Sequence, residues 1–262
     1  MPRPTHRFHA EDIAAPAVSL IGNKAHHAAS VLRLKTGAEV ELFDGRGGLA
    51  RGRIVEIARG KVIVSIESRD EAPRPEPIVH LGFAVPKGRR LDWLLEKATE
   101  LGAASLEPVI FQRSVAGGAE LSDAKRRRWF AHCLAAAKQC GLNWLPKICP
   151  PACLVDYVIR HGEGLCILGQ PGPHAARLTD LLARREAGRP IRLLVGPEGG
   201  LTEPELAAVR DAGFLPARLG RTTLRIETAA IALLAATIAA CGERASQPIR
   251  EASADLFEGR AD

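Results

Sequence analysis

Aromatic residues are scarce in this chain: they make up 4% of its 262 residues, and only one of them is Tyr. There is also a single Met, so a core has to rest mainly on Leu, Val, Ile and Ala. With 46% apolar and 25% charged residues, the composition is otherwise ordinary for a soluble globular protein. The length allows one large domain or two modest ones, and either arrangement can bury a core.

The chain lacks the patterns typical of secreted, membrane and zinc proteins. Residues 1–13 contain no apolar run of the length that a signal peptide needs. The most apolar stretch, 228–241, is too short to span a bilayer and lies between Glu227 and Glu243. The six cysteines form no CxxC pair and no set of Cys and His ligands. We therefore expect a cytoplasmic protein with reduced thiols, no membrane contact and no metal site.

Positive charge is in modest excess. Lys and Arg outnumber Asp and Glu by 36 to 30, which gives a net charge of +6 and a pI near 9.2. This excess favours an anionic partner such as nucleic acid, but many soluble proteins share it. The densest basic run, 125–128, is equally compatible with a solvated helix face.

The segment 71–77 divides the chain into two parts. Its three prolines at alternate positions continue neither a sheet nor a helix. Before it, apolar and polar residues alternate as in strands, which predicts a small barrel-like β-domain. In that part we expect a helix at 24–34 and strands at 39–43, 49–58 and 61–68.

After this linker, strands alternate with helices, which is typical of an α/β fold with a parallel sheet. Several of the expected strands are short, wholly apolar runs, as in buried parallel sheets. We expect strands at 78–85, 106–111, 165–168, 191–195 and 215–219, and helices at 89–101, 123–140, 203–212 and 227–241.

A glycine-rich turn, Gly196-Pro197-Glu198-Gly199-Gly200, follows one of these apolar strands. After it, Thr202 to Glu205 matches a capping box that begins the next helix. Open α/β sheets bind ligands at the carboxyl ends of their strands, and glycine lets a ligand lie against bare backbone. A tight turn without a ligand is the alternative interpretation. The motif is neither a P-loop nor GxGxxG, so it supports ATP or NAD binding poorly.

A second loop of the same kind comes twenty residues later. The strand at 215–219 ends in Gly220, and a polar loop leads into a helix whose first turn carries Arg225, Glu227 and Thr228. Two such loops at adjacent strand ends can form two walls of one pocket.

Together, these motifs resemble the RsmE family of ribosomal RNA uracil-N3 methyltransferases, in the SPOUT superfamily of knotted methyltransferases. The resemblance rests on GPEGG at 196–200, LGxxxLRxETA at 219–229 and an Ala-rich last helix. Further matches cover nearly the whole chain: His6-Arg7-Phe8, 27–35, 42–45, Pro86-Lys87-Gly88, Lys97, 99–102, Pro108 and Arg113-Ser114.

The resemblance implies an α/β fold: a SPOUT-type trefoil-knotted parallel-sheet domain at 78–244, preceded by a PUA-like β-barrel domain at 1–72 that binds RNA. A polar tail follows at 245–262. The implied reaction is methylation of a uridine N3 in 16S ribosomal RNA, with S-adenosyl-L-methionine as cofactor. The implied partners are this RNA or the small ribosomal subunit, and a second copy of the chain in a homodimer. The alternatives are a non-catalytic ribosome-assembly protein that binds RNA and keeps the fold, and an unrelated nucleotide-dependent α/β enzyme.

The resemblance also implies three sets of site residues. The cofactor would be bound by Leu168, Gly169, Gly196, Pro197, Glu198, Gly199, Gly200, Leu219, Gly220, Leu224 and Arg225. RNA would be bound by Arg7, Arg33, Lys35, Lys87, Arg90 and Arg113. Methylation at N3 requires the N3 proton to leave and places negative charge on the flanking carbonyl oxygens. We therefore expect a guanidinium and a carboxylate in the catalytic set, which is Arg225, Glu198 and Glu227. For Glu227, simple stabilisation of the helix dipole is the alternative role.

The chain departs from the family pattern in its long helix. Where relatives commonly show Glu-Gln-x-x-Arg, this chain has Lys138 and Leu142 at the two charged positions. If those groups pair in relatives, the joint loss costs little, because no charge is left stranded. If they contact RNA or shape the site, substrate affinity or activity changes.

Overall fold

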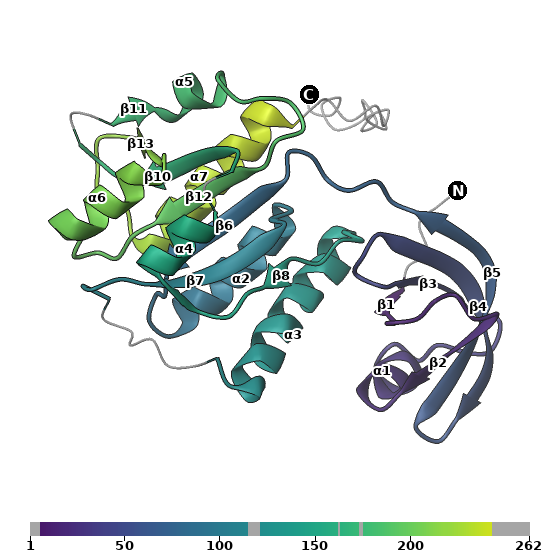
Figure 1. Cartoon of the computed structure of the whole chain (residues 1–262). Helices are drawn as coiled ribbons and strands as arrows, with labels where there is room; N and C mark the ends of the chain where they lie inside the picture. Colours follow the sequence, from purple (N-terminus) through teal and green to yellow (C-terminus); the bar gives the residue numbers. More distant parts are fainter. Residues whose placement is uncertain (1–5, 115–120, 162, 173–174, 243–262) are drawn as a thin grey trace, which may run out of the picture.

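A computed structural model describes residues 6–114, 121–161, 163–172 and 175–242; the polar tail expected at 245–262 lies outside them. Figure 1 shows an α/β body and a smaller β-body side by side, with α3 between them. Within the described ranges, no helix combines the length and the apolar character that crossing a membrane requires.

The N-terminal domain is a five-stranded sheet in the order β1-β3-β4-β5-β2. Its strands are β1 (Arg7–His9), β2 (Ala17–Ile21), β3 (Glu39–Phe43), β4 (Gly48–Ala58) and β5 (Lys61–Glu71). β1 pairs with β3 in parallel, and the other pairs are antiparallel. The apolar residues that alternate along β3 and β5, among them Leu42 and Val64, are buried in a core that belongs to this domain alone.

The helical patch expected at 24–34 is shorter and less regular than predicted. It consists of α1 (Asn23–His26) followed by a π-helical turn at His27–Val31. Both parts bury a small side chain, Ala25 and Ala28, in the core of the domain.

The C-terminal domain is built on an eight-stranded sheet in the order β11-β13-β10-β12-β6-β7-β8, with β9 also paired to β7. All of these pairs are parallel, as predicted. The strands are β6 (Val79–Ala84), β7 (Ser105–Ile110), β8 (Lys147–Ile148), β9 (Ala152–Cys153), β10 (Leu165–Gly169), β11 (Ala176–Arg177), β12 (Ile191–Val195) and β13 (Leu215–Arg218). The three strands of only two residues were not predicted, because so short a segment shows no periodicity.

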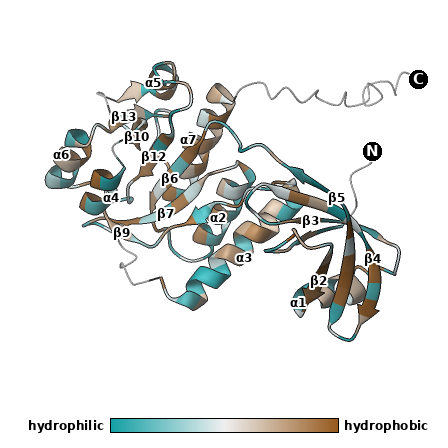
Figure 2. Ribbon diagram, turned by 45° about the vertical axis from the view of Figure 1, so that its right-hand side comes forward, coloured by the Kyte–Doolittle hydropathy of each residue, from teal (hydrophilic) through white to brown (hydrophobic). Residues whose placement is uncertain are grey.

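Helices cover the sheet, and Figure 2 shows its hydrophobic strands enclosed between them. The helices are α2 (Arg89–Glu100), α3 (Asp123–Cys140), α4 (Leu154–Arg160), α5 (Leu178–Leu182), α6 (Glu203–Asp211) and α7 (Ile226–Cys241). α2 packs against α3 and α7, whereas α4 packs against α6. α2 buries Leu94, Leu95 and Ala98, which recur at helical spacing on one face.

The two domains are also joined by contacts between β1 and the C-terminal end of α3. Arg7 donates a hydrogen bond to the carbonyl oxygen of Ala137 at 3.0 Å and another to the side chain of Asn143. Its guanidinium also pairs with Glu41 at 2.8 Å and lies 4.2 Å from the centre of the Phe43 ring. These contacts fix α3 against the N-terminal sheet.

Candidate functional site

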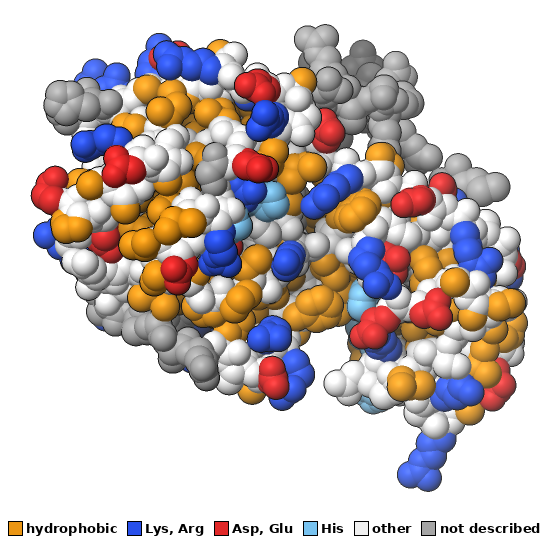
Figure 3. All heavy atoms as spheres, in the orientation of Figure 1, with side chains coloured by type: hydrophobic (Ala, Val, Ile, Leu, Met, Phe, Trp, Pro, Cys, Tyr) orange, Lys and Arg blue, Asp and Glu red, His pale blue; other side chains and the backbone are white. Residues whose placement is uncertain are grey.

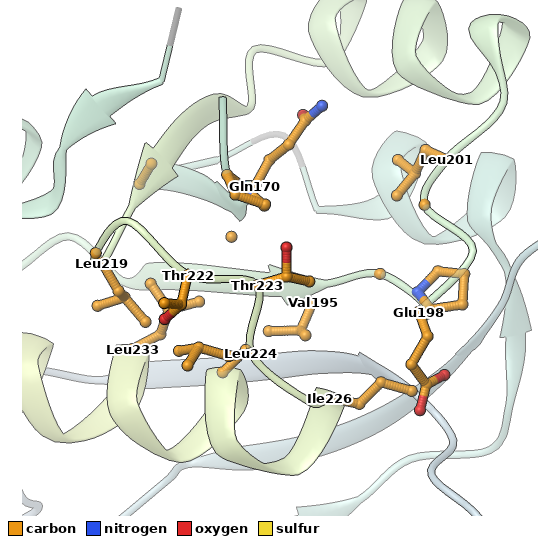
Figure 4. Close-up of a pocket in the computed structure, with 18 residues that line it drawn as sticks. Gln170, Val195, Glu198, Leu201, Leu219, Thr222, Thr223, Leu224, Ile226 and Leu233 are labelled. Carbon is orange, nitrogen blue, oxygen red and sulfur yellow. The ribbon is translucent and has the colours of Figure 1, made fainter. Parts of the chain in front are cut away.

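Three loops that follow neighbouring strands line one pocket (Figure 4). They come after β10, β12 and β13, and β10 lies between the other two strands in the sheet. Because parallel strands end at the same edge, their loops converge there. The predicted convergence of the two glycine-rich loops is therefore confirmed, and the loop after β10 adds a third wall.

The walls of this pocket are mainly apolar. Val195, Leu201, Leu219, Leu224 and Leu233 surround it in Figure 4, with the polar side chains of Gln170, Thr222 and Thr223 among them. Backbone is uncovered at Gly220, where an added Cβ would meet no atom within 4 Å. Apolar walls for a flat ring, with bare backbone at its edge, suit the adenine of S-adenosylmethionine.

Most of the predicted cofactor residues line the pocket: Gly169, Gly196, Pro197, Glu198, Gly200, Leu219, Gly220 and Leu224. Of the others, Leu168 is buried within β10, Gly199 faces the side chain of Arg113, and Arg225 is exposed at the N-cap of α7. The sequence analysis missed Gln170, Thr222 and Thr223, although each stands within or beside a predicted loop. Cofactor binding by all of these residues stays a prediction.

The glycine-rich loop after β12 is held from two sides. Arg113, which follows β7, donates a hydrogen bond to the carbonyl oxygen of Gly199 at 2.9 Å. The buried carboxylate of Glu205 accepts hydrogen bonds from the backbone N–H of Gln112 at 2.7 Å and of Thr202 at 2.8 Å. The second of these bonds belongs to the predicted capping box. The loop is thus tied to β7 before any ligand arrives.

A second cavity lies beside the first along the same edge of the sheet. It shares Glu198, Pro197 and Ile226 with the first cavity, and its other lining residues are Ala84, Val85, Lys87, Arg90 and Ser114. These residues follow β6 and β7 or begin α2, so this cavity lies over β12, β6 and β7. The two cavities therefore meet at the loop that follows β12.

Charged side chains gather at this meeting point. The Nη1 atom of Arg90 lies 3.8 Å from a carboxylate oxygen of Glu198 and 3.8 Å from one of Glu227. Glu227 is only 6% exposed, and its Oε2 atom has no hydrogen-bond partner among the described residues. In Figure 4 the carboxylate of Glu198 lies beside Ile226, far from Leu219.

The predicted RNA-binding residues fall in several places. Arg33 and Lys35 are exposed on the N-terminal domain, and Lys87 and Arg90 line the second cavity. Arg7 and Arg113 have the contacts within the protein that are described above, and their RNA contacts stay a prediction. On the face shown in Figure 3, Lys and Arg side chains are spread over both domains, with a notch between the domains at the lower edge.

The two departures from the family pattern line neither cavity, and Lys138 lies at the contact between the domains. The ammonium group of Lys138 lies 5.8 Å from the centre of the Phe8 ring, close enough for a cation–π contact. Burial lowers the pKa of Lys138. The backbone N–H of Leu142 donates to the carbonyl oxygen of Ala137 at 3.1 Å. Lys138 thus contributes to domain packing.

Family models match both parts of the chain. Residues 73–238 match a model described as an RNA methyltransferase domain, and residues 20–67 match an RNA methyltransferase PUA domain. The fold expected from the resemblance, a parallel-sheet domain after a PUA domain, is confirmed, whereas the trefoil knot stays a prediction. Within the described ranges, no group of three or more His, Cys, Asp or Glu residues could hold a metal ion.

Two structures similar to this chain were solved with the cofactor. Ribosomal RNA small subunit methyltransferase E from Neisseria gonorrhoeae, bound to S-adenosyl methionine, is 29% identical and has a TM-score of 0.78 over 89% of this chain and 97% of that one. A putative methyltransferase from Legionella pneumophila, in complex with the same cofactor, is 29% identical with a TM-score of 0.79 over the same shares.

Curated relatives agree with the structures. Ribosomal RNA small subunit methyltransferase E of Mycobacterium bovis is 35% identical over 229 residues, which cover 84% of this chain and 86% of that protein. The protein of that name from Synechocystis is 31% identical over 229 residues, which cover 86% and 74%. The chain therefore belongs to the ribosomal RNA small subunit methyltransferase E family, RsmE, as its motifs predicted.

Proposed function

We propose that this protein transfers a methyl group from S-adenosyl-L-methionine to the N3 atom of a uridine in 16S ribosomal RNA. The observation that carries the proposal is the apolar three-loop pocket at the carboxyl edge of the sheet, in a chain of this family. The bound cofactor supplies an electrophilic methyl group. The main task of the protein is then to hold the donor and the base in line, which can contribute much of the rate enhancement.

Different residues of the site are proposed to hold the cofactor and to act on the base. We propose that the predicted loop residues hold the cofactor through backbone groups left uncovered at glycine. Glu198 and Glu227 are proposed as the carboxylates of the catalytic set, because Glu198 lines both cavities and Glu227 lies 3.8 Å from Arg90, which lines the second. Arg225 completes the predicted set; its exposure at the N-cap of α7 supports a proposed contact with the RNA.

The RNA is proposed to bind across both domains. Arg33 and Lys35 of the PUA domain and Lys87 of the C-terminal domain are exposed cations that can contact phosphates. A base inside an RNA helix cannot reach the pocket, so the target uridine has to be unstacked first. Because the proposed substrate is ribosomal RNA, we place this activity in the cytoplasm.

A homodimer and a trefoil knot belong to the same proposal. Glu227 is the only charged residue of α7, and helices that are apolar on all sides are usually covered. A second copy of the chain can provide that cover. Threading of the chain is suggested by β13, which lies between β10 and β11 although it follows both in sequence. Light scattering should give about twice the chain mass of 28.0 kDa; a monomer at all concentrations would contradict the dimer.

The test of the activity is methyl transfer from labelled S-adenosylmethionine to small ribosomal subunits that lack the modification. Nucleoside analysis should find the label in 3-methyluridine, and large subunits should take up none. The Arg225→Ala variant should methylate more slowly. Cofactor binding without transfer to small subunits would contradict the proposed reaction and favour a non-catalytic role in ribosome assembly.

A further inference from the structure

We propose that the second cavity, lined by Lys87, Arg90 and Ser114, is the subsite for the target base, with Arg90 and Glu227 as the groups that meet it. This inference rests on the proposed function, because it takes the base to be uracil. It assigns the cation beside the base to Arg90, which the sequence analysis had placed only among general RNA contacts.

The position of the cavity is the first argument. The donor and the acceptor of a methyl group have to touch, so the base must lie in a space that opens directly onto the cofactor pocket. The second cavity adjoins that pocket, because Glu198, Pro197 and Ile226 line both cavities. Its remaining walls come from the end of β6, the segments after β6 and β7, and the start of α2, none of which lines the first pocket.

The unfilled bonding capacity of Glu227 is the second argument. Its carboxylate is almost fully buried, yet its Oε2 atom has no partner among the described residues. A buried carboxylate oxygen without a hydrogen bond is costly, so a donor from a ligand would relieve the cost. In a uridine, whose N1 is bonded to the ribose, the only ring N–H is the N3–H that has to be removed.

The loose pairing of Arg90 is the third argument. Its Nη1 atom lies 3.8 Å from oxygens of both Glu198 and Glu227, which is too far for hydrogen bonds. Among the described residues, its side chain donates one hydrogen bond, from Nε to the carbonyl oxygen of Lys87 at a long 3.4 Å. The guanidinium is therefore able to donate to a uracil carbonyl oxygen while staying near both carboxylates.

Methyl transfer at this subsite joins the loss of one proton to the formation of one bond. The N3–H bond breaks and its proton passes to the carboxylate of Glu227, while the N3 lone pair forms the new bond to the methyl carbon. The bond between that carbon and sulfur breaks, and its electron pair stays on sulfur. The negative charge that N3 shares with the two flanking carbonyl oxygens is stabilised by the guanidinium of Arg90. Cytosine carries no proton at N3, so the same groups select uracil.

The first experiment uses Glu227→Gln in the full-length protein, with small subunits as substrate. The amide oxygen still accepts a hydrogen bond but takes no proton, so kcat should fall about 100-fold or more while KM changes little. Cofactor affinity, measured by calorimetry, should stay within about twofold. Glu203→Gln, an exposed carboxylate in the first turn of α6, is the matched control and should keep normal kcat.

Substituting 5-fluorouridine at the target position separates proton transfer from a structural role. Its N3 proton is more acidic, so it should restore much of the lost kcat in Glu227→Gln and raise the wild-type rate less. If Glu227→Gln were slow only because its fold is damaged, a more acidic N3 proton would not restore its kcat. Absence of any rescue, or a Glu227→Gln variant with normal kcat, overturns the role of Glu227.

Arg90 is tested by Arg90→Ala and Arg90→Lys, with Arg184→Ala as an exposed control away from both cavities. Arg90→Ala should lower kcat about 100-fold with unchanged cofactor affinity, and Lys should recover part of the loss. Normal kcat in Arg90→Ala overturns the subsite. If the wild-type protein methylates no uridine, the proposed function fails; if it does and the variants behave like the controls, only this inference fails.

Discussion

At the scale of single residues, Arg113 shows how one side chain outside the first pocket can hold the glycine-rich loop that follows β12. Its guanidinium donates to the carbonyl oxygen of Gly199, and its Cβ atom lies 3.3 Å from where a Cβ on Gly199 would be. We expect Arg113→Ala to loosen the loop and to raise the dissociation constant for S-adenosylmethionine about 5- to 10-fold, the equivalent of one hydrogen bond. Calorimetry measures this dissociation constant, with Arg126→Ala as an exposed control. Equal constants for Arg113→Ala and the wild-type protein would contradict the role of Arg113.

At position 82, close packing and not turn geometry explains why the residue is glycine. An added Cβ would lie 2.5 Å from the ring of Tyr157, a fully buried residue of α4. We expect Gly82→Ala to lower the free energy of unfolding by about 1–3 kcal/mol through overpacking. Gly220→Ala is the comparison, because its Cβ would meet nothing within 4 Å, and its unfolding free energy should stay within about 0.5 kcal/mol of wild type. Urea titration distinguishes the two variants.

At the scale of elements, His80 on β6 makes stability depend on pH. Burial, together with the positive charge of Arg192, lowers the pKa of His80 from 6.5 to about 4. Between these values the unfolded chain binds a proton that the folded chain excludes, so the free energy of unfolding falls as the pH drops. Because the ring is partly exposed, we expect a loss of about 1 kcal/mol from pH 7 to pH 5.

Urea unfolding at these two pH values checks the prediction in His80→Gln. The variant should lose less stability than wild type on acidification, while His26→Gln, at an exposed position, should behave like wild type. His161 also has a lowered pKa because it is buried, so some dependence will remain. An unchanged difference between pH 7 and pH 5 in His80→Gln would contradict the role of His80.

Elements with a clear period were predictable, and short ones were not. The helix expected at 123–140 is α3, and the apolar runs expected as strands at 165–168 and 191–195 are β10 and β12. These elements are long enough, and their apolar pattern clear enough, to be recognised from sequence. α4 and α5, with seven and five residues, were missed. The first pocket follows from two motifs that the sequence displays. The second cavity could not be predicted, because Arg90 and Glu227 are brought together only by the packing of α2 against α7.

At the scale of the whole molecule, Arg7 joins the two domains, and we expect it to couple their unfolding. Its side chain is 10% exposed and contacts Glu41 in one domain and Ala137 in the other. We expect Arg7→Ala to cost about 3 kcal/mol, because Glu41 then loses its closest partner in a buried setting. In calorimetry, Arg7→Ala should unfold in two separate transitions, one for each domain. In Arg7→Lys the two transition temperatures should lie closer together. A single transition at the wild-type temperature would show that Arg7 does not join the domains.

The carboxylate of Glu198 borders both cavities, so under the proposed function we expect the donor and the base to bind cooperatively. A positively charged sulfonium in the first cavity would compete with Arg90 for this carboxylate, which would leave the guanidinium more bonding capacity for the base in the second. Thermodynamic reciprocity requires the base to strengthen donor binding by the same factor. After transfer the sulfur would be neutral and this attraction would end, so we expect the enzyme to bind the methylated RNA more weakly. By the same reasoning, we expect unmodified subunits to bind this enzyme more weakly when the methyl donor is scarce.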